Sequence, residues 1–242
     1  MQRHLENLNW KQFQQLVPRK TDRVLLPVGT IEAHGPGALG TDTIIPSYLA
    51  GQLAEPLNAL VAPGINYGIT RSLIGFPGSL TVSPETFERY ATDVGLSLGQ
   101  AGFTRIIIVN GHGGNTEQLQ RAGQQLWRQS RIRSVVVNWW LTAEQIGLKY
   151  FGGIGHAMAD ELGALQAIDP GLVTRSDYRQ DEAGACPAGI TPFPHHRAMI
   201  AGQPGKGYPE FNLAKSKKYL NETVALLTAS LREIMEGWDQ IG

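Results

Sequence analysis

The chain of 242 residues is poor in cysteine and has only one, Cys186. A single cysteine excludes a framework of internal disulfide bonds and is typical of proteins in a reducing cytoplasm. An excess of positive charge is also missing, because 21 Lys and Arg residues balance 21 Asp and Glu residues. A general nucleic-acid-binding protein needs such an excess to neutralise phosphates, so we expect no nucleic-acid partner.

Long hydrophobic runs are absent as well. No apolar stretch approaches the roughly 20 residues of a membrane span, and the segment Met1–Trp10 lacks the apolar centre of a signal peptide. We therefore expect a cytoplasmic protein without a membrane partner. Charged residues make up 17% of the chain, below the usual ~25%. Because so few charges are available to cover a free surface, the composition favours a homo-oligomer.

Short β-branched runs alternate with helical stretches, which is typical of an α/β domain with a mostly parallel, buried sheet. The length suits a single domain over residues 1–242, without internal repeats. The expected strands are Arg23–Val28, Ala59–Ala62, Arg105–Asn110 and Arg133–Asn138. The expected helices are Thr43–Ala54, Ser83–Gln100, Thr116–Ser130, Ala157–Ile168 and Asn212–Trp238. Residues Tyr178–Gly207 show no period and predict a long ordered loop beside a site.

Metal-binding side chains follow the first strand. If the chain stays extended, Glu32 and His34 project from the same face, because side chains two residues apart in a strand do so. A carboxylate and an imidazole together suit zinc, manganese or iron. Asp42 returns through a Gly/Pro-rich loop and has two interpretations: a third ligand, or the N-cap of a helix that begins at Thr43.

A glycine-rich turn follows the strongest strand, over Asn110–Asn115. One interpretation is a phosphate-binding loop that leads into a helix. The other is a metal ligand, His112, which stands between Gly111 and Gly113 and so has few side-chain neighbours to satisfy it.

A third group of polar residues lies near the expected helix Ala157–Ile168. His156 and Glu161 cannot share a helical face, since positions five apart differ by about 140°. We therefore place His156 in the preceding loop and Glu161 in the first turns of the helix. Asp160 and Glu161 could instead only complement the helix dipole. His195 and His196 lie in the long loop, where no further residue supports a second metal or a substrate contact.

Taken together and in this order, these segments resemble the creatininase (creatinine amidohydrolase) family. The resemblance covers roughly Pro27 to Leu165. It is carried by Val28-Gly-Thr-Ile-Glu-Ala-His-Gly-Pro36, Gly40-Thr-Asp42, Asn66-Tyr-Gly68, Gly75–Pro84 and Asn110-Gly-His-Gly-Gly-Asn115. It implies a three-layer α/β/α fold with a mostly parallel central sheet, a homo-oligomer that is often a hexamer, and a metal-dependent amidohydrolase activity on cyclic amides, formamides or related small-molecule C–N bonds.

The resemblance also assigns two divalent ions per subunit (Zn, Mn or Fe) to five ligands: Glu32, His34, Asp42, His112 and Glu161. Asp42 would bridge the ions, and His156 would be the catalytic residue that faces the substrate. Three carboxylates leave one positive charge on two divalent ions, which favours a bridging hydroxide that attacks the substrate carbon. His156 would stabilise the tetrahedral intermediate or protonate the departing nitrogen. Supporting or substrate-contacting candidates are Asn115, Asp160 and Trp139.

Some positions depart from the family pattern. Creatininase proper has a Tyr-Glu pair where this chain has Gly113-Gly114, and a second histidine where this chain has Gly37. The interval from His34 to Asp42 is also one residue shorter. The absence of the Tyr predicts a roomier pocket for a larger substrate, such as a formylamino-pyrimidine nucleotide or a peptide end. Trp139 and Trp140 could stack on a flat substrate, or pack in the core.

Two alternatives to the amidohydrolase remain at this point. The first is a non-catalytic metal-binding protein on the same fold, whose altered loop no longer binds two ions. The second is a nucleotide- or phosphate-binding protein that uses the Asn110–Asn115 turn, although no basic residue lies near it. The presence of all five ligand residues favours the enzyme.

Overall fold

The computed structural model describes residues 1–187 and 189–241. At its centre lies a four-stranded sheet of order β2-β1-β3-β4, in which all neighbouring strands are parallel. The strands are β1 (Arg23–Val28), β2 (Leu60–Val61), β3 (Arg105–Asn110) and β4 (Arg133–Asn138). The bounds of β1, β3 and β4 agree with the prediction, whereas β2 is shorter than the predicted strand.

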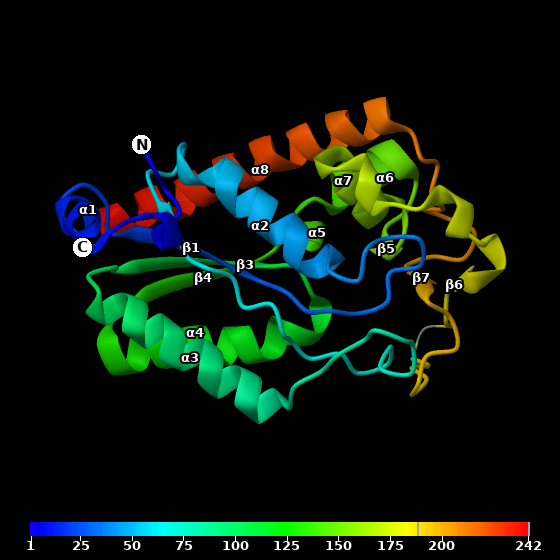
Figure 1. Cartoon of the computed structure of the whole chain (residues 1–242), viewed down its shortest axis with the longest axis horizontal. Helices are drawn as coiled ribbons and strands as arrows, with labels where there is room; N and C mark the ends of the chain where they lie inside the picture. The colour runs from blue at the N-terminus through cyan, green and yellow to red at the C-terminus, as the bar shows by residue number, and fades with distance from the viewer. Residues whose placement is uncertain (188, 242) are drawn as a thin grey trace.

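Helices cover both faces of the sheet and complete three layers (Figure 1). Helices α2 (Thr41–Ala54) and α8 (Leu213–Gln240) lie over one face, and α3 (Pro84–Gln100) and α4 (Thr116–Ser130) lie over the other. The predicted α/β class and its three-layer arrangement are confirmed.

The central strand β3 shows why the sheet is buried on both sides. Ile107 and Val109 belong to the core beneath α2 and α8, whereas Ile106 and Ile108 belong to the core beneath α3 and α4. A strand with two covered faces must be apolar at successive positions, which explains the uninterrupted run of Ile and Val in the sequence.

The chain changes direction across the sheet between β1 and β3. After β1, the chain passes through α2 to β2 on one side of β1, and then through α3 to β3 on its other side. The loops that leave the carboxyl ends of β1 and β3 therefore diverge. In open α/β sheets such a switch point is the usual place for a ligand.

Helix caps agree closely with the sequence. The Ser83 hydroxyl accepts a hydrogen bond from the Thr86 main-chain N–H at 3.2 Å and caps α3, and Asn212 caps α8 in the same way. The bounds of α4 agree with the prediction, and those of α3 agree apart from Ser83, which caps the helix. Helix α8 continues to Gln240, slightly beyond its predicted end.

Helix α2 corrects one of the two interpretations of Asp42. The helix begins at Thr41 after Gly40, two residues earlier than predicted, so Asp42 lies inside the first turn. Its carboxylate does not cap the helix but points to two histidines. The interpretation of Asp42 as an N-cap is therefore wrong.

A small second sheet forms beside the main one, of order β5-β7-β6. Its strands are β5 (Gly155–His156), β6 (Ala183–Gly184) and β7 (Met199–Ala201). Two of these strands lie within Tyr178–Gly207, so the prediction of a loop without regular structure is only partly right. The remaining α-helices among the described residues are α1 (Trp10–Leu16), α5 (Trp139–Thr142), α6 (Glu144–Phe151) and α7 (Ala159–Ile168).

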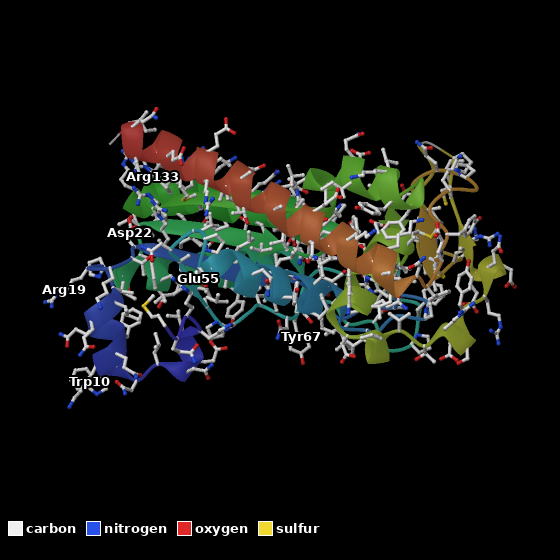
Figure 2. The ribbon with its side chains drawn as sticks, turned by 90° about the horizontal axis from the view of Figure 1, so that it is seen from above. Trp10, Arg19, Asp22, Glu55, Tyr67 and Arg133 are labelled. Carbon is white, nitrogen blue, oxygen red and sulfur yellow. The ribbon has the colours of Figure 1, made fainter. Side chains whose placement is uncertain are left out.

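The N-terminal segment and the small sheet lie at opposite ends of the molecule. Figure 2 shows Trp10 and Arg19 at the end farthest from the small sheet. No helix among the described residues combines the length and the apolar character that a membrane span needs.

Candidate metal centre

Five side chains with metal-binding groups meet at the carboxyl ends of β1 and β3. Glu32 and His34 lie in the loop after β1, and His112 lies in the turn after β3. Asp42 and Glu161 lie in the first turns of α2 and α7. The structure thus brings together all five ligand residues that the sequence comparison implied, from four separate segments of the chain.

Asp42 is central to this cluster because its two carboxylate oxygens face different histidines. Its Oδ1 lies 3.0 Å from His34 Nε2, and its Oδ2 lies 2.9 Å from His112 Nδ1. His34 Nε2 is also 3.6 Å from Glu161 Oε2, and His112 Nδ1 is 3.4 Å from Glu32 Oε1. Two sets of three donors result, and they share Asp42.

The ring nitrogens that face away from the cluster are held by the main chain. His34 Nδ1 donates to the Glu32 carbonyl at 2.9 Å, and His112 Nε2 donates to the Ile69 carbonyl at 2.9 Å. This hydrogen bond keeps a proton on the far nitrogen, so the near nitrogen is the one that offers a lone pair to a metal when the ring is neutral. This is the usual arrangement around metal-binding histidines.

Charge and burial act against each other in this cluster. Burial lowers the pKa of His34, but Asp42 and Glu161 outweigh it and raise that pKa to about 10. Burial likewise lowers the pKa of His112, whereas Glu32 and Asp42 raise it to about 9. The positively charged form of both imidazoles is therefore strongly favoured, which shows that the carboxylates around them attract positive charge.

The carboxylates respond in different ways to the same surroundings. Burial acts to raise the pKa of Asp42, but the charges of the two histidines outweigh it and hold that pKa below its usual range. Burial raises the pKa of Glu161 well above its usual range and that of Glu32 to a smaller extent. Three buried carboxylates this close together need positive charge between them.

The donor set fits divalent metal ions. The two triads, Glu32–Asp42–His112 and His34–Asp42–Glu161, each have ligand atoms within 4.8 Å of one another. Asp42 Oδ2 is buried and takes no hydrogen bond from the described residues, although it lies beside His112. A buried oxygen of this kind is suited to a metal bond, and mixed nitrogen and oxygen donors suit zinc, manganese or iron.

His156 lies in β5 at the edge of the same cluster. Its Nε2–H donates to the Ala33 carbonyl at 2.8 Å, and its Nδ1 lies 3.5 Å from Glu32 Oε1. Its ring centroid is 4.2 Å from that of His34. Burial and the charge of His34 lower the pKa of His156 to about 3. The ring is therefore neutral at pH 7, with an unprotonated Nδ1.

Two glycines allow the first turn of α2 to approach the sheet. A Cβ atom on Gly29, which follows β1, would lie 2.1 Å from the Asp42 carbonyl oxygen. A Cβ atom on Gly111, which follows β3, would lie 2.1 Å from the same oxygen. Only glycine fits at both strand ends, so these residues let Asp42 enter the switch point between β1 and β3.

Two of the weaker candidates hold the surroundings of the cluster. Asn115 is buried; its Oδ1 accepts the Ile69 N–H at 2.9 Å and its Nδ2 donates to the Gly29 carbonyl at 3.0 Å. Asp160 Oδ1 accepts the Gly155 N–H at 3.0 Å, and burial raises the pKa of Asp160 to about 7. Both side chains therefore position main chain next to the ligands, and Asn115 is not free to bind a substrate.

The two tryptophans after β4 differ in what they can contact. Trp139 is only 1% exposed and belongs to the hydrophobic core, so it is not available to a substrate. Trp140 lines the cavity above the cluster instead. The substrate-contacting candidate Trp139 is thus a core residue, and of the two only Trp140 keeps the stacking interpretation that the sequence left open. Two adjacent tryptophans carry no periodic signal that could decide between them.

A cavity of about 350 Å³ opens above the cluster. It is lined by Glu32, Asp42, His112, His156 and Glu161, together with Trp140 and Gly113. A Cβ atom on Gly113 would lie 3.8 Å from the Trp140 ring, so this wall has space for a side chain that glycine lacks. The volume is at the small end of the range for small-molecule sites.

The chain is similar in sequence to proteins of a known family. The model of the creatininase family, described as creatinine amidohydrolase, matches residues 6–229. The mycofactocin precursor peptide peptidase of Mycolicibacterium smegmatis is 38% identical over 119 residues, which are 46% of this chain and 46% of that protein. The chain thus matches less than half the length of that relative. The creatinine amidohydrolase of Pseudomonas putida is 27% identical over 186 residues, 69% of this chain and 72% of that protein.

Solved creatininase structures share the fold. One has a TM-score of 0.83 at 22% identity and covers 96% of this chain and 97% of its own. A variant described as the Zn-Zn type has a TM-score of 0.83 at 23% identity, with 96% and 98% covered. A manganese form has a TM-score of 0.81 at 21% identity, with 96% and 98% covered. Those creatininases are thus described with zinc or manganese.

Proposed function

The chain belongs to the creatininase family, and from this premise we propose that it is a metal-dependent hydrolase of a carbon–nitrogen bond. The relatives named above are a peptidase and an amidohydrolase, so both of them cleave C–N bonds. The candidate site of this chain has the donors, the cavity and the neutral histidine that such a reaction needs.

The observation that carries the proposal is the position of Asp42 between two donor sets. Its Oδ1 faces His34 and its Oδ2 faces His112, each about one hydrogen-bond length away. A carboxylate that joins two ligand sets is the arrangement expected of a two-metal site. We therefore assign Glu32, Asp42 and His112 to one ion, and His34, Asp42 and Glu161 to the other.

The bound ions would lower the pKa of a water molecule and polarise the substrate carbon. The protein contributes the orientation of the ligands, through the carbonyls of Glu32 and Ile69 that hold the two imidazoles. Gly29 and Gly111 contribute the space in which Asp42 stands between the ligand sets.

His156 is assigned to proton transfer. Its Nε2–H is committed to the Ala33 carbonyl, so Nδ1 is the nitrogen that exchanges protons. Nδ1 has a free lone pair at the edge of the cavity, so it is the atom that would take up a proton released in the reaction and return it to the departing nitrogen. Asp160 supports this role by holding the Gly155 N–H and with it the start of β5.

The proposed substrate is a small amide or formamide, or the end of a peptide. The cavity is of small-molecule size, and the open wall between Gly113 and Trp140 leaves room for a group beside the cleaved bond. The Trp140 ring offers a flat apolar face to that group.

Metal content per chain tests the proposal. The protein is purified without chelator or metal-affinity resin, and elemental mass spectrometry is applied to wild type, Asp42→Asn and His112→Ala. We expect Asp42→Asn to lose about two ions per chain relative to wild type, because it removes the shared ligand. His4→Ala is the matched control, since His4 lies outside the cluster and pairs with Glu6.

Equal metal content in wild type and Asp42→Asn, after reconstitution with zinc, manganese and iron, would contradict the two-metal site. The non-catalytic alternative would then be favoured. If the metal is lost as expected, cyclic amides, formamides and short peptides are the substrates to screen. The predicted homo-oligomer is checked on the same samples by light scattering.

A further inference from the structure

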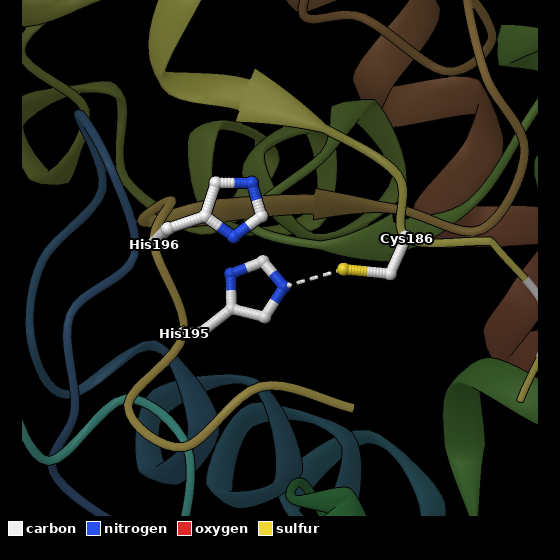
Figure 3. A group of neighbouring side chains, drawn as sticks. All are labelled: Cys186, His195 and His196. Atoms are coloured by element: carbon white, nitrogen blue, oxygen red, sulfur yellow. Dashed lines mark hydrogen bonds between the residues drawn. The ribbon is translucent and has the colours of Figure 1, made fainter. Parts of the chain in front are cut away.

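A second group of metal-binding side chains shares no residue with the candidate metal centre. Figure 3 shows Cys186, His195 and His196 with their side chains turned toward one another. Cys186 follows strand β6, and the two histidines precede strand β7. The three residues come from the two ends of one connecting segment.

The distance between Cys186 and His195 is close to that of two zinc ligands. Cys186 Sγ lies 3.4 Å from His195 Nε2. A sulfur at about 2.3 Å and a nitrogen at about 2.05 Å from a tetrahedral zinc are separated by about 3.6 Å. Ligand atoms of all three residues lie within 4.8 Å of one another. His196 is exposed and stacks on His195 with ring centroids 4.9 Å apart.

His195 is prepared for metal binding by its surroundings. Its side chain is buried, with only 6% of the residue exposed, and its Nδ1 lies 2.9 Å from the Arg197 carbonyl oxygen. The Arg197 N–H also lies 3.1 Å from Nδ1, so Nδ1 meets both a donor and an acceptor of Arg197. In the tautomer that donates Nδ1–H to the carbonyl, Nε2 has a free lone pair directed at Cys186. The candidate metal centre uses the same device at His34 and His112.

We propose that Cys186, His195 and His196 bind one zinc ion, in a site separate from the two-metal centre. A thiolate and two imidazoles are soft and borderline donors that favour zinc. A cavity of about 550 Å³ lined by His196 adjoins the site and can supply water as the fourth ligand.

The position of the site gives the zinc ion a structural role in the small sheet. It would join the end of β6 to the start of β7, which pair in one sheet through Ala183 and Met199. Strand β7 also pairs with β5 through His156 and Ile200. A zinc ion here would fix the small sheet that holds His156 beside the catalytic cavity, without contacting substrate.

Cobalt substitution tests this proposal directly. Cys186 is the only cysteine of the chain, and the two-metal centre contains no sulfur. A near-ultraviolet thiolate-to-cobalt charge-transfer band can therefore come only from this site. Under reducing conditions, titration of Co²⁺ into metal-free protein should develop the band to saturation by about three equivalents, the total that the two proposed sites hold, and added zinc should remove it.

Variants separate the two sites. Cys186→Ser should abolish the band while the remaining cobalt still binds, and His196→Ala should weaken the affinity of the band-forming site by at least about 10-fold. Asp42→Asn, which removes the shared ligand of the other centre, should leave the band intact. Elemental analysis should likewise show about one zinc per chain that is lost in Cys186→Ser and kept in Asp42→Asn.

No band with folded wild-type protein, or a band that saturates only at millimolar cobalt, would overturn the proposal. Circular dichroism of each variant confirms that it is folded. Because the readout is the sulfur–metal band, the result does not depend on whether the chain is a hydrolase.

Discussion

Glu32 offers the most conservative test of a single ligand. Its carboxylate is buried and lies 3.4 Å from His112 and 3.5 Å from His156. Glu32→Gln keeps the side-chain volume but removes the charge. We expect kcat to fall at least about 100-fold, because the loss of a residue that only supports a metal ligand already lowers activity by up to about 100-fold. The melting temperature should change little because the side chain belongs to a loop cluster. Unchanged turnover with full metal loading would remove Glu32 from the ligand set.

The role of His156 can be distinguished from that of the ligands by the metal content of a variant that lacks its side chain. If it moves protons, His156→Ala should lower kcat by about 10²- to 10⁴-fold and leave metal content unchanged. Parallel measurement of turnover and metal stoichiometry separates the two roles. Loss of an ion in this variant would identify His156 as a ligand, in line with its place beside Glu32 and His34.

Protonation of the histidines predicts how metal binding depends on pH. The pKa values of His34 and His112 are raised to about 10 and about 9 in the protein without bound metal. At pH 7 both rings are therefore protonated and must lose their protons to bind metal. Affinity should rise with pH up to about 9–10 and fall in acid. Calorimetry in buffers of different ionisation enthalpy should show at least about two protons released per chain, because the raised pKa of Glu161 can add to the protons of the histidines; no dependence on the buffer would contradict this.

At the scale of elements, the start of α2 depends on the glycines that face it. Gly111→Ala would place a Cβ 2.1 Å from the Asp42 carbonyl oxygen and 2.8 Å from a Pro46 ring carbon. The first turn of α2 must then move away from β3 and carry the Asp42 carboxylate with it. We expect metal affinity to fall at least about 10-fold, which is the usual effect of disturbing the position of a ligand.

A matched control lies on the same helix. Gly51 has no atom within 4 Å of its missing Cβ, so Gly51→Ala should leave metal binding unchanged and stabilise the helix by about 0.5–1 kcal/mol. Metal titration and urea unfolding of both variants check these predictions. Equal effects of the two substitutions would show that the close approach at Gly111 does not matter.

The elements differ in how far the sequence predicts them. Strands β1, β3 and β4 contain uninterrupted apolar runs, and α3 begins with a serine cap followed by proline, so local chemistry marks their bounds. The strands β5, β6 and β7 are two or three residues long and form by pairing with one another. Such short strands have no period of their own, and for that reason they were not predicted.

The candidate site likewise has residues whose role the sequence predicts and one whose role it leaves open. The ligand residues were found because they stand at strand ends in a pattern similar to that of a known family. Asp42 remained ambiguous because capping and metal binding both favour a carboxylate near a helix start. Only the approach of α2 to Gly29 and Gly111 decides between them, and that contact joins residues far apart in the sequence.

At the scale of the whole molecule, metal removal should lower stability. A ligand at 100-fold its Kd stabilises the folded state by about 2.7 kcal/mol, and 1 kcal/mol corresponds to about 2–4 °C for a chain of this size. Each ion should therefore raise Tm by about 5–11 °C under those conditions. A chelator should reverse the shift in wild type but have a smaller effect in Asp42→Asn. Identical melting curves with and without metal would argue against binding at the centre.

The two ends of the chain lie together, at the amino end of the central strands, whereas the small sheet lies at the opposite end of the molecule (Figure 1). The cavity above the candidate metal centre is at the carboxyl end, beside β5 and α7. An affinity tag, a fused protein or a link to a solid support at either terminus should consequently leave the cavity facing solution. This chain is therefore well suited to immobilised assays, in which many candidate substrates are passed over one sample of protein.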